Sequence, residues 1–134
     1  MKFYVASRFG NKDEVRKLYG ILKQQGHNIS LDWTIHESVK PYGQNEEKAA
    51  RYSIEDVEGV RRSQVFVLLS DESGTGMYVE MGVALHSFLE KGSPLVYVVG
   101  DYTDRCSFFF HPAVRRVKTI EEVLEEVSDG KKTP

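Results

Sequence analysis

The sequence predicts an α/β fold in which a parallel five-stranded sheet carries helices on both faces. Short apolar segments alternate along the chain with segments of helical periodicity, and this alternation is typical of parallel strands joined by right-handed helical crossovers. The run Val65–Leu69 is apolar without a break, as expected of a central strand covered on both faces. Five such strands favour the doubly wound, flavodoxin-like order 2-1-3-4-5.

The expected strands are short apolar runs bounded by polar or turn-forming residues. They cover residues 2–6, 28–31, 64–70, 95–99 and 114–118. Two longer segments, residues 32–44 and 100–112, show no regular pattern. We expect these to be loops, and long loops in compact domains often carry function.

The first helix is marked by its caps and its apolar face. It is predicted to begin at Asn11, which forms a capping-box pattern with Glu14, and to end at Gly26. Its apolar face consists of Val15, Leu18, Tyr19 and Leu22. The later helices are expected at residues 46–62, 77–90 and 120–127.

Individual residues define the later helices. The inward positions of the second helix are predicted to be Ile54, Val57 and Val60. The third helix is expected to stop at Gly92, and Thr119 with Glu122 is expected to cap the last one. We expect a single domain over residues 1–127, followed by a flexible tail over residues 128–134.

The bulk composition excludes several classes of partner. The 134 residues fit one domain, and the formal net charge of −2 gives no basic field to attract a nucleic acid polymer or an anionic membrane. No apolar run approaches the roughly 18 residues of a membrane span, and residues 2–6 begin a strand pattern without the apolar core of a secretory signal. A single cysteine, Cys106, cannot form an intrachain disulfide. We therefore expect a cytoplasmic protein.

The sequence shows no pattern for a cofactor or a metal. It contains neither a phosphate-loop motif nor a dinucleotide-binding fingerprint after the first strand. The four histidines lack metal-ligand spacing, and Cys106 has no second cysteine beside it. We expect neither a bound cofactor nor a metal.

The predicted strand order places a ligand site beyond the carboxyl ends of the first and third strands, where the order reverses. Ser7 and Arg8 follow the first strand. On the other side, the candidate contacts are Asp71, Ser73, Gly74, Thr75, Gly76 and Met77. The glycines allow the backbone to approach a ligand, and the helix after them offers free N–H groups. This segment can hold a phosphate or a sugar hydroxyl, or it can simply start the helix.

Two carboxylates are within reach of this crevice. Glu80 is the only charged side chain between Met77 and Leu89, in a helix that is otherwise apolar or small. A carboxylate in such surroundings is costly to bury unless it is hydrogen-bonded or paired. Asp56 lies on the helix before the third strand. Alternatively, Glu80 is a surface or first-turn charge, and Asp56 is an ordinary charge on a helix surface.

Three segments carry a resemblance to a known family. They are the opening strand and turn Phe3–Arg8, the segment Asp56–Val60 before the buried strand, and Gly74–Ala84, a small-residue turn followed by a Glu-x-Gly-x-Ala helix. Together they span most of residues 2–99. This combination resembles the nucleoside 2-deoxyribosyltransferase superfamily, which includes the 2'-deoxynucleoside 5'-phosphate N-hydrolases.

The resemblance implies roles for individual residues. Glu80 is expected to be the nucleophile, and Asp56 to assist proton transfer and ligand positioning. The first strand and turn are expected to line the pocket through Phe3, Tyr4, Ser7 and Arg8. Family members are oligomers in which a neighbouring subunit often completes the pocket. We therefore expect a homo-oligomer, a dimer or higher, in which Ser107 of the loop 104–111 is a donor and Phe108–Phe110 form an interface or belong to the core.

One position departs from the family pattern. The transferases carry a carboxylate six residues before the nucleophile, where it meets the sugar 5'-hydroxyl, and here that position is Gly74, between Ser73 and Thr75. Hydroxyls and free amides accept a 5'-phosphate that a carboxylate would repel, although Asp71 and Glu72 are close in sequence. The sequence therefore favours a nucleotide substrate and leaves the acceptor open.

The implied reaction parallels that of a retaining glycosidase. Glu80 attacks C1' as the base leaves, and the resulting glycosyl ester passes to water or to another base. The leaving base needs a proton, from Asp56 or from a group of the long loop. Tyr4, Trp33 and Tyr42 are candidates to stack on the base. Three loop residues either line the pocket or only hold the loop in place: Trp33, His36 and Tyr42.

Two other functions remain open on sequence grounds. The same crevice can serve a nucleotide-binding or regulatory module that turns nothing over. A lone glutamate in an α/β domain is also compatible with a TIR-like NAD glycohydrolase. Release of a base from nucleosides or nucleotides distinguishes an enzyme from a nucleotide-binding module. Release of nicotinamide from NAD tests whether the protein is an NAD glycohydrolase.

Overall fold

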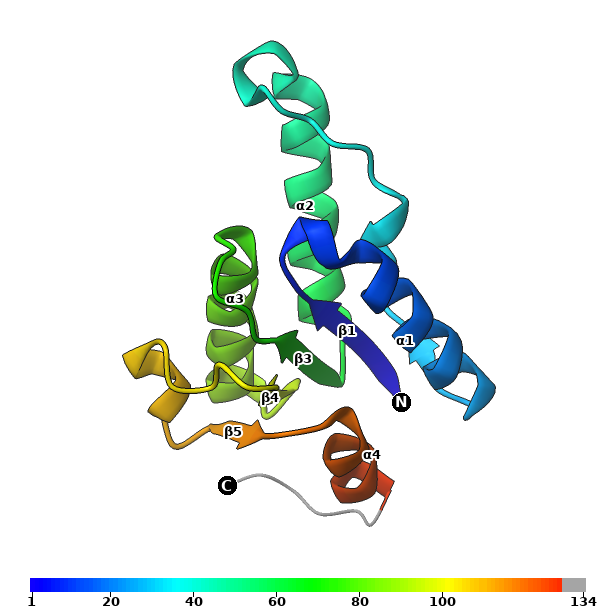
Figure 1. Cartoon of the computed structure of the whole chain (residues 1–134), viewed down its shortest axis with the longest axis vertical. Coiled ribbons are helices and arrows are strands. Elements are labelled where there is room, and N and C mark those ends of the chain that lie inside the picture. The colour runs from blue at the N-terminus through cyan, green and yellow to red at the C-terminus, as the bar shows by residue number, and fades with distance from the viewer. Residues whose placement is uncertain (129–134) are drawn as a thin grey trace.

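The computed structural model describes residues 1–128 and confirms the predicted fold class. Five parallel strands form one sheet in the order β2-β1-β3-β4-β5, with helices on both faces (Figure 1). The strands are β1 (Lys2–Ala6), β2 (Asn28–Ile29), β3 (Val65–Leu69), β4 (Leu95–Val99) and β5 (Val114–Val117). The strand order reverses between β1 and β3, as the sequence predicts.

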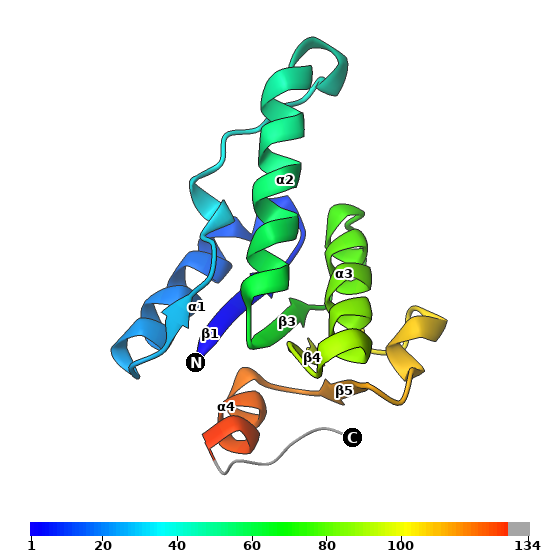
Figure 2. The same cartoon turned by 180° about the vertical axis from the view of Figure 1, so that it is seen from behind.

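Four α-helices connect or follow these strands in the described chain. They are α1 (Lys12–Gln24), α2 (Glu46–Arg62), α3 (Gly76–Lys91) and α4 (Ile120–Ser128). Helices α2 and α3 lie side by side over one face of the sheet, and α1 and α4 lie over the other (Figures 1 and 2). Within residues 1–128, no helix combines the length and the apolar character needed to cross a membrane.

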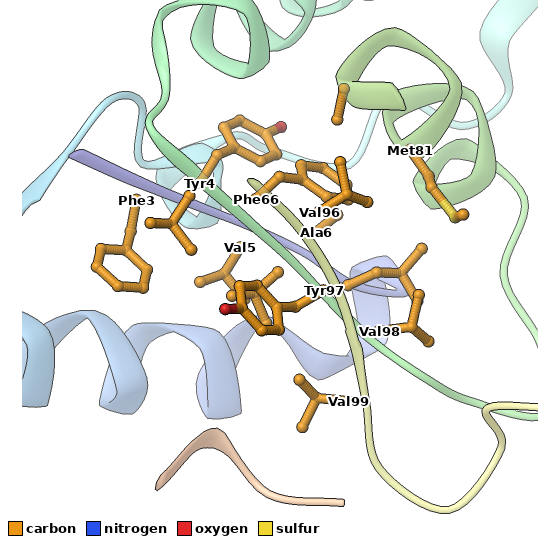
Figure 3. Packing of buried hydrophobic residues seen from close by; sticks show 14 of the residues in the cluster. Phe3, Tyr4, Val5, Ala6, Phe66, Met81, Val96, Tyr97, Val98 and Val99 are labelled. Carbon is orange, nitrogen blue, oxygen red and sulfur yellow. The ribbon is translucent and has the colours of Figure 1, made fainter. Parts of the chain in front are cut away.

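The core has two layers because successive residues of a strand point to opposite faces of the sheet. Tyr4, Phe66 and Val96 are register neighbours and point to the face that α2 and α3 cover (Figure 3). Val5 and Tyr97 point to the other face, where the Tyr97 hydroxyl donates to a carboxylate of α4 at 3.2 Å. All five side chains are fully buried. This alternation places Tyr4 on the α3 side of the sheet.

Two predicted helix ends are confirmed. After α3, Gly92 has a φ of 80°, the left-handed conformation that glycine adopts at little cost. At the start of α4, the amide of Glu122 donates to Thr119 Oγ1 at 3.3 Å, and the amide of Thr119 donates to Glu122 Oε2 at 2.9 Å. Ser128, predicted to begin the tail, is instead the last residue of α4. The rest of the predicted tail, residues 129–134, lies outside the described residues.

The predicted capping box at the start of α1 is wrong. Asn11 occupies the N-cap position, but its side chain caps no backbone amide of the helix. Its amide nitrogen donates instead to Asp71 Oδ2 at 3.0 Å and to Ser7 Oγ at 3.1 Å. Its amide oxygen accepts from Arg8 Nη2 at 3.2 Å. An ionised carboxylate is a stronger acceptor than a neutral group, so Asn11 serves the strand ends rather than the helix.

The prediction that Ile54 points inward is also wrong. Its side chain is 65% exposed, whereas Val60 is fully buried and Val57 is half-buried. The cause is the position of α2, whose N-terminal part extends beyond the sheet (Figure 1) and buries fully only Gly59 and Val60. The predicted loop, residues 32–44, runs alongside this extension with short 3₁₀ turns at Trp33–Ile35 and Tyr42–Gln44.

Candidate active site

Glu80 lies in the N-terminal half of α3, at the edge of the surface that packs on the sheet. This part of the helix is anchored by three buried side chains, Met77, Met81 and Ala84. Glu80 is one turn beyond the first of these and therefore borders the buried stripe. The hydroxyl of Tyr4, from β1, donates a hydrogen bond to its carboxylate. The Tyr4 ring is stacked on Phe66 with a centroid distance of 6.1 Å, which fixes the direction of the hydroxyl.

Burial makes Glu80 an unusual carboxyl group. It raises the pKa of Glu80 to about 8, the Tyr4 hydroxyl lowers that pKa by stabilising the carboxylate, and the charge of Asp56 raises it further. Burial also raises the pKa of Tyr4 well above its ordinary value, and the charges of Glu80 and Asp56 add to this effect. The Tyr4 hydroxyl therefore stays protonated and remains a hydrogen-bond donor, whereas Glu80 changes its protonation state near neutral pH.

Asp56 is the second carboxylate of this cluster, on α2. Its Oδ1 is buried and accepts no hydrogen bond within residues 1–128, and it faces the imidazole of His36, whose Nδ1 is 3.7 Å away. Burial raises the pKa of Asp56 to about 6, with His36 lowering it and Glu55 raising it. A carboxyl group with an unused buried acceptor and a pKa in this range is suited to holding and releasing a proton.

His36 connects the long loop to α2. Its ring is buried and lies flat on Tyr52, with a centroid distance of 3.8 Å and an interplanar angle of 5°. Its Nε2 is 3.0 Å from Glu55 Oε1, and its Nδ1 faces Asp56. The imidazole thus lies between two carboxylates of one helix. Sequence reasoning left the role of His36 open and did not single out Tyr52 or Glu55.

The predicted residues at the strand ends form a second cluster around Asp71. Asp71 Oδ1 accepts from the amide of Ser73 at 3.0 Å and from its hydroxyl at 3.3 Å. Asp71 Oδ2 accepts from Asn11 at 3.0 Å and from Arg8 Nε at 3.4 Å. These contacts lower the pKa of Asp71 to about 2, first through the Ser73 amide, then through Asn11 and Arg8. Ser7 joins the cluster through Asn11.

Three residues predicted to line the pocket have core contacts instead. Phe3 is fully buried and packs edge-to-face on His27 at 4.9 Å, on the face opposite Tyr4 (Figure 3). Trp33 is buried, and its Nε1 donates to the carbonyl of Val5 at 2.6 Å. This hydrogen bond ties the long loop to β1. The third is Met77, one of the anchors of α3.

The other predicted contacts lie around the start of α3 and beyond β4. Gly74 has a φ of 117°, a conformation that favours glycine. Thr75 and Gly76 are exposed, and the Thr75 side chain caps no amide of α3. Ser107 is exposed in the turn Ser107–Phe110. Of the three phenylalanines in that turn, only the middle one is buried: Phe109, whose ring packs on Tyr78 at 5.9 Å.

Two surface hollows lie away from the cluster formed by Tyr4, Asp56 and Glu80. One is at the end of α1 and the other at the start of α2. Neither is lined by Tyr4, Asp56 or Glu80, so neither is the crevice that the sequence predicts. Tyr42, a predicted base-stacking residue, is exposed at the far end of α2. Within residues 1–128, no group of three or more His, Cys, Asp or Glu side chains is placed to hold a metal ion.

Comparisons of the chain with protein families, with curated proteins and with solved structures return no match.

Proposed function

We propose that this protein cleaves the N-glycosidic bond of a nucleoside or nucleoside 5'-monophosphate, with Glu80 as the nucleophile. The observation that supports this most directly is the contact between the Tyr4 hydroxyl and the Glu80 carboxylate, with Asp56 close enough for its charge to affect both. Two carboxyl groups with raised and different pKa values, set beside a fixed hydroxyl donor, are the parts that a retaining glycosyl transfer needs.

The nucleophile and the fixed donor have complementary roles. Ionised Glu80 attacks C1' as the bond to the base breaks, and a glycosyl ester of Glu80 forms. The transition state carries positive charge on the sugar, which favours the ionised form of Glu80 at the moment of attack. Tyr4 keeps one carboxylate oxygen oriented by donating to it. The ester then transfers the sugar to water or to a second base, and Glu80 is regenerated.

Asp56 is the proposed proton donor to the leaving base. A purine or pyrimidine is a poor leaving group as an anion, so its departure needs protonation. The pKa of Asp56, raised to about 6 chiefly by burial, lets it hold a proton and lose it to the base. His36, 3.7 Å from Asp56 Oδ1, can stabilise the carboxylate that results. In the second step, Asp56 takes a proton back from the attacking water.

We propose a nucleotide as the preferred substrate. Asp71 already accepts four hydrogen bonds and is paired with Arg8, so it is not free to receive a sugar hydroxyl. Glu72 accepts from the Tyr102 hydroxyl at 3.0 Å. Gly74 places no carboxylate where the related transferases have one. A second copy of the chain is proposed to close the pocket, with Ser107 of its exposed turn as a donor.

The test is base release from a panel of deoxyribo- and ribonucleosides and their 5'-monophosphates. Reactions are followed by chromatography with and without a competing free base, which separates hydrolysis from transfer. Glu80→Gln is expected to lower turnover at least about 1000-fold while circular dichroism stays unchanged. Glu90→Gln, an exposed position on the same helix, is the matched control and is expected to keep full activity.

Other outcomes distinguish the alternatives. Binding of nucleotides without release of any base favours a regulatory module. Release of nicotinamide from NAD, with deoxynucleotides untouched, favours an NAD glycohydrolase. Equal turnover in Glu80→Gln and in the unmodified protein removes Glu80 from the mechanism.

A further inference from the structure

We infer that Gly59 is a positioning residue, whose missing side chain lets α2 lie against β1 so that the Tyr4 hydroxyl reaches Glu80. The inference rests on the proposed function of the Glu80 site and adds a residue that touches neither the carboxylate nor the substrate. Gly59 lies in the buried part of α2, a place where glycine is a poor helix former compared with alanine.

The space around Gly59 explains why a glycine stands there. A Cβ atom at this position would lie 2.6 Å from Leu31 Cβ and 3.1 and 3.3 Å from the Tyr4 ring atoms Cε2 and Cδ2. The Leu31 contact is closer than Cβ atoms tolerate, and it is made by an atom next to the backbone. Any side chain at position 59 therefore moves α2, the Leu31 segment or the Tyr4 ring.

The helix is also held close at this point. The hydroxyl of Ser30 donates to the carbonyl of Gly59 at 2.7 Å, and the amide of Ser30 donates to the carbonyl of Phe3 at 3.0 Å. Ser30 thus links α2 to β1 directly across the position of Gly59. A displacement of α2 at Gly59 breaks or stretches this link. The two hydrogen bonds of Ser30 therefore hold α2 close to β1.

The consequence reaches the site through Tyr4 and Asp56. The Tyr4 ring is in close contact with the position of Gly59 and is also stacked on the ring of Phe66, so pressure from α2 rotates or shifts the ring. Asp56 is three residues before Gly59 and on the same side of the helix. A hydrogen bond fails over a few tenths of an ångström, whereas the interaction between charges falls off slowly with distance. Loss of the Tyr4 contact is therefore the dominant expected effect.

The experiment measures the protonation of Glu80 directly. The side-chain carboxyl signal of Glu80 is followed by ¹³C NMR against pH, and it is identified by its absence in Glu80→Gln. The charged and titratable groups that face Glu80 are Tyr4 from β1 and Asp56 from α2. Because the Tyr4 hydroxyl stabilises the carboxylate, both Gly59→Ala and Tyr4→Phe are expected to shift the titration midpoint upward.

Two controls separate positioning from a general change of stability. Gly20→Ala on α1, where a Cβ meets nothing within 4 Å, is expected to leave the midpoint unchanged. In a Tyr4→Phe background, Gly59→Ala is expected to cause no further shift, since the contact is already gone. In the base-release assay, Gly59→Ala is expected to lower kcat/KM about 10- to 100-fold, mostly in kcat.

The titration is measured without substrate, so it decides the inference even if no substrate turns over. An unchanged or lowered midpoint in Gly59→Ala, or an equal shift in the Tyr4→Phe background, overturns it. If Gly59→Ala does not fold, the double variant with Leu31→Gly removes the closest contact. Recovery of folding with a raised midpoint supports the inference. An unchanged midpoint, or failure of both variants to fold, contradicts it.

Discussion

Two carboxylates near the junction of β1 and β3 have opposite surroundings. Asp71 accepts four hydrogen bonds, one of them from Arg8, and its pKa is lowered to about 2. Glu80 accepts one hydrogen bond from a hydroxyl, is half-buried within range of the Asp56 charge, and has its pKa raised to about 8. Both residues follow the same strand, β3, and are nine positions apart in the chain.

The difference separates a carboxylate that stabilises the fold from the one that we propose as the nucleophile. Every hydrogen bond to Asp71 stabilises its charged form, so folding and ionisation support each other there. At Glu80 and Asp56, folding opposes ionisation, which costs stability and leaves groups able to exchange protons near neutral pH. Functional sites commonly contain groups with perturbed pKa values that lower the stability of the fold. Variants at these three carboxylates, and the pH dependence of activity, test this contrast.

Apart from the loss already expected for Glu80→Gln, the largest effect is expected from Asp56→Asn. The amide cannot protonate the leaving base, so kcat is expected to fall about 100- to 1000-fold. The loss is expected to be greatest for the bases that leave least readily as anions, and smallest for substrates with an activated leaving group. The measurement is the rate of base release across such a series. A uniform loss for all leaving groups contradicts the role of proton donor.

The pH dependence of kcat/KM is expected to show two limbs. The productive form has Glu80 ionised and Asp56 protonated, and their pKa values are about 8 and about 6. kcat/KM therefore rises about tenfold per pH unit below pH 6, is flat between 6 and 8, and falls about tenfold per unit above 8. In Asp56→Asn, the falling limb is expected to disappear. The reversed assignment of roles gives the same unmodified curve, so the curve alone does not assign them.

Thermal unfolding of Glu80→Gln is expected to show a gain in stability at high pH. The folded-state pKa of Glu80 is about 8, above its ordinary 4.5, so the unmodified protein loses stability as pH rises from about 4.5 through 8. Glutamine does not ionise, and the variant is expected to be more stable by roughly 2–4 kcal/mol at pH 9, with little difference at pH 4. A Tm difference that is the same at both pH values contradicts this account of Glu80.

The smallest effect, of opposite sign, is expected from Asp71→Asn. The variant loses charge-assisted hydrogen bonds and is expected to lose about 1–2 kcal/mol at pH 7. The contribution of Asp71 is present above its ordinary pKa of 3.8 and is lost as pH falls through about 2. The stabilities of the two proteins should therefore converge in acid. Urea unfolding at pH 7 and pH 2.5 tests this convergence.

The strand order and most helix boundaries were predictable because they depend on local patterns. The unbroken run Val65–Leu69 predicts a central strand, and α2 begins and ends at the predicted residues 46 and 62. The isolation of Glu80 in an apolar helix also indicated a buried carboxylate, and the structure gives it a partner, Tyr4. The position of Tyr4 on the α3 side follows from strand parity once the register is known.

The rest depends on contacts between distant segments, which periodicity does not encode. Asn11 fits a helix cap locally, but the charge of Asp71, 60 residues away, attracts its amide. His36 stacks on Tyr52 because the long loop folds back along α2. The spacing of Tyr52, Asp56 and Gly59 at intervals of four and three residues places them on one face of α2. This was the one local signal that could have identified their shared surface.

The central claim is that Glu80 forms a covalent bond to the sugar. A 2'-fluoro-substituted nucleotide slows both steps by destabilising their positively charged transition states. An activated leaving base restores the rate of the first step, so the glycosyl ester accumulates. Mass spectrometry of the digested protein is expected to show one sugar phosphate on the peptide that contains Glu80, in the unmodified protein and in Glu90→Gln. Glu80→Gln is expected to show none. Base release with no adduct on Glu80, or an adduct that persists in Glu80→Gln, contradicts the account.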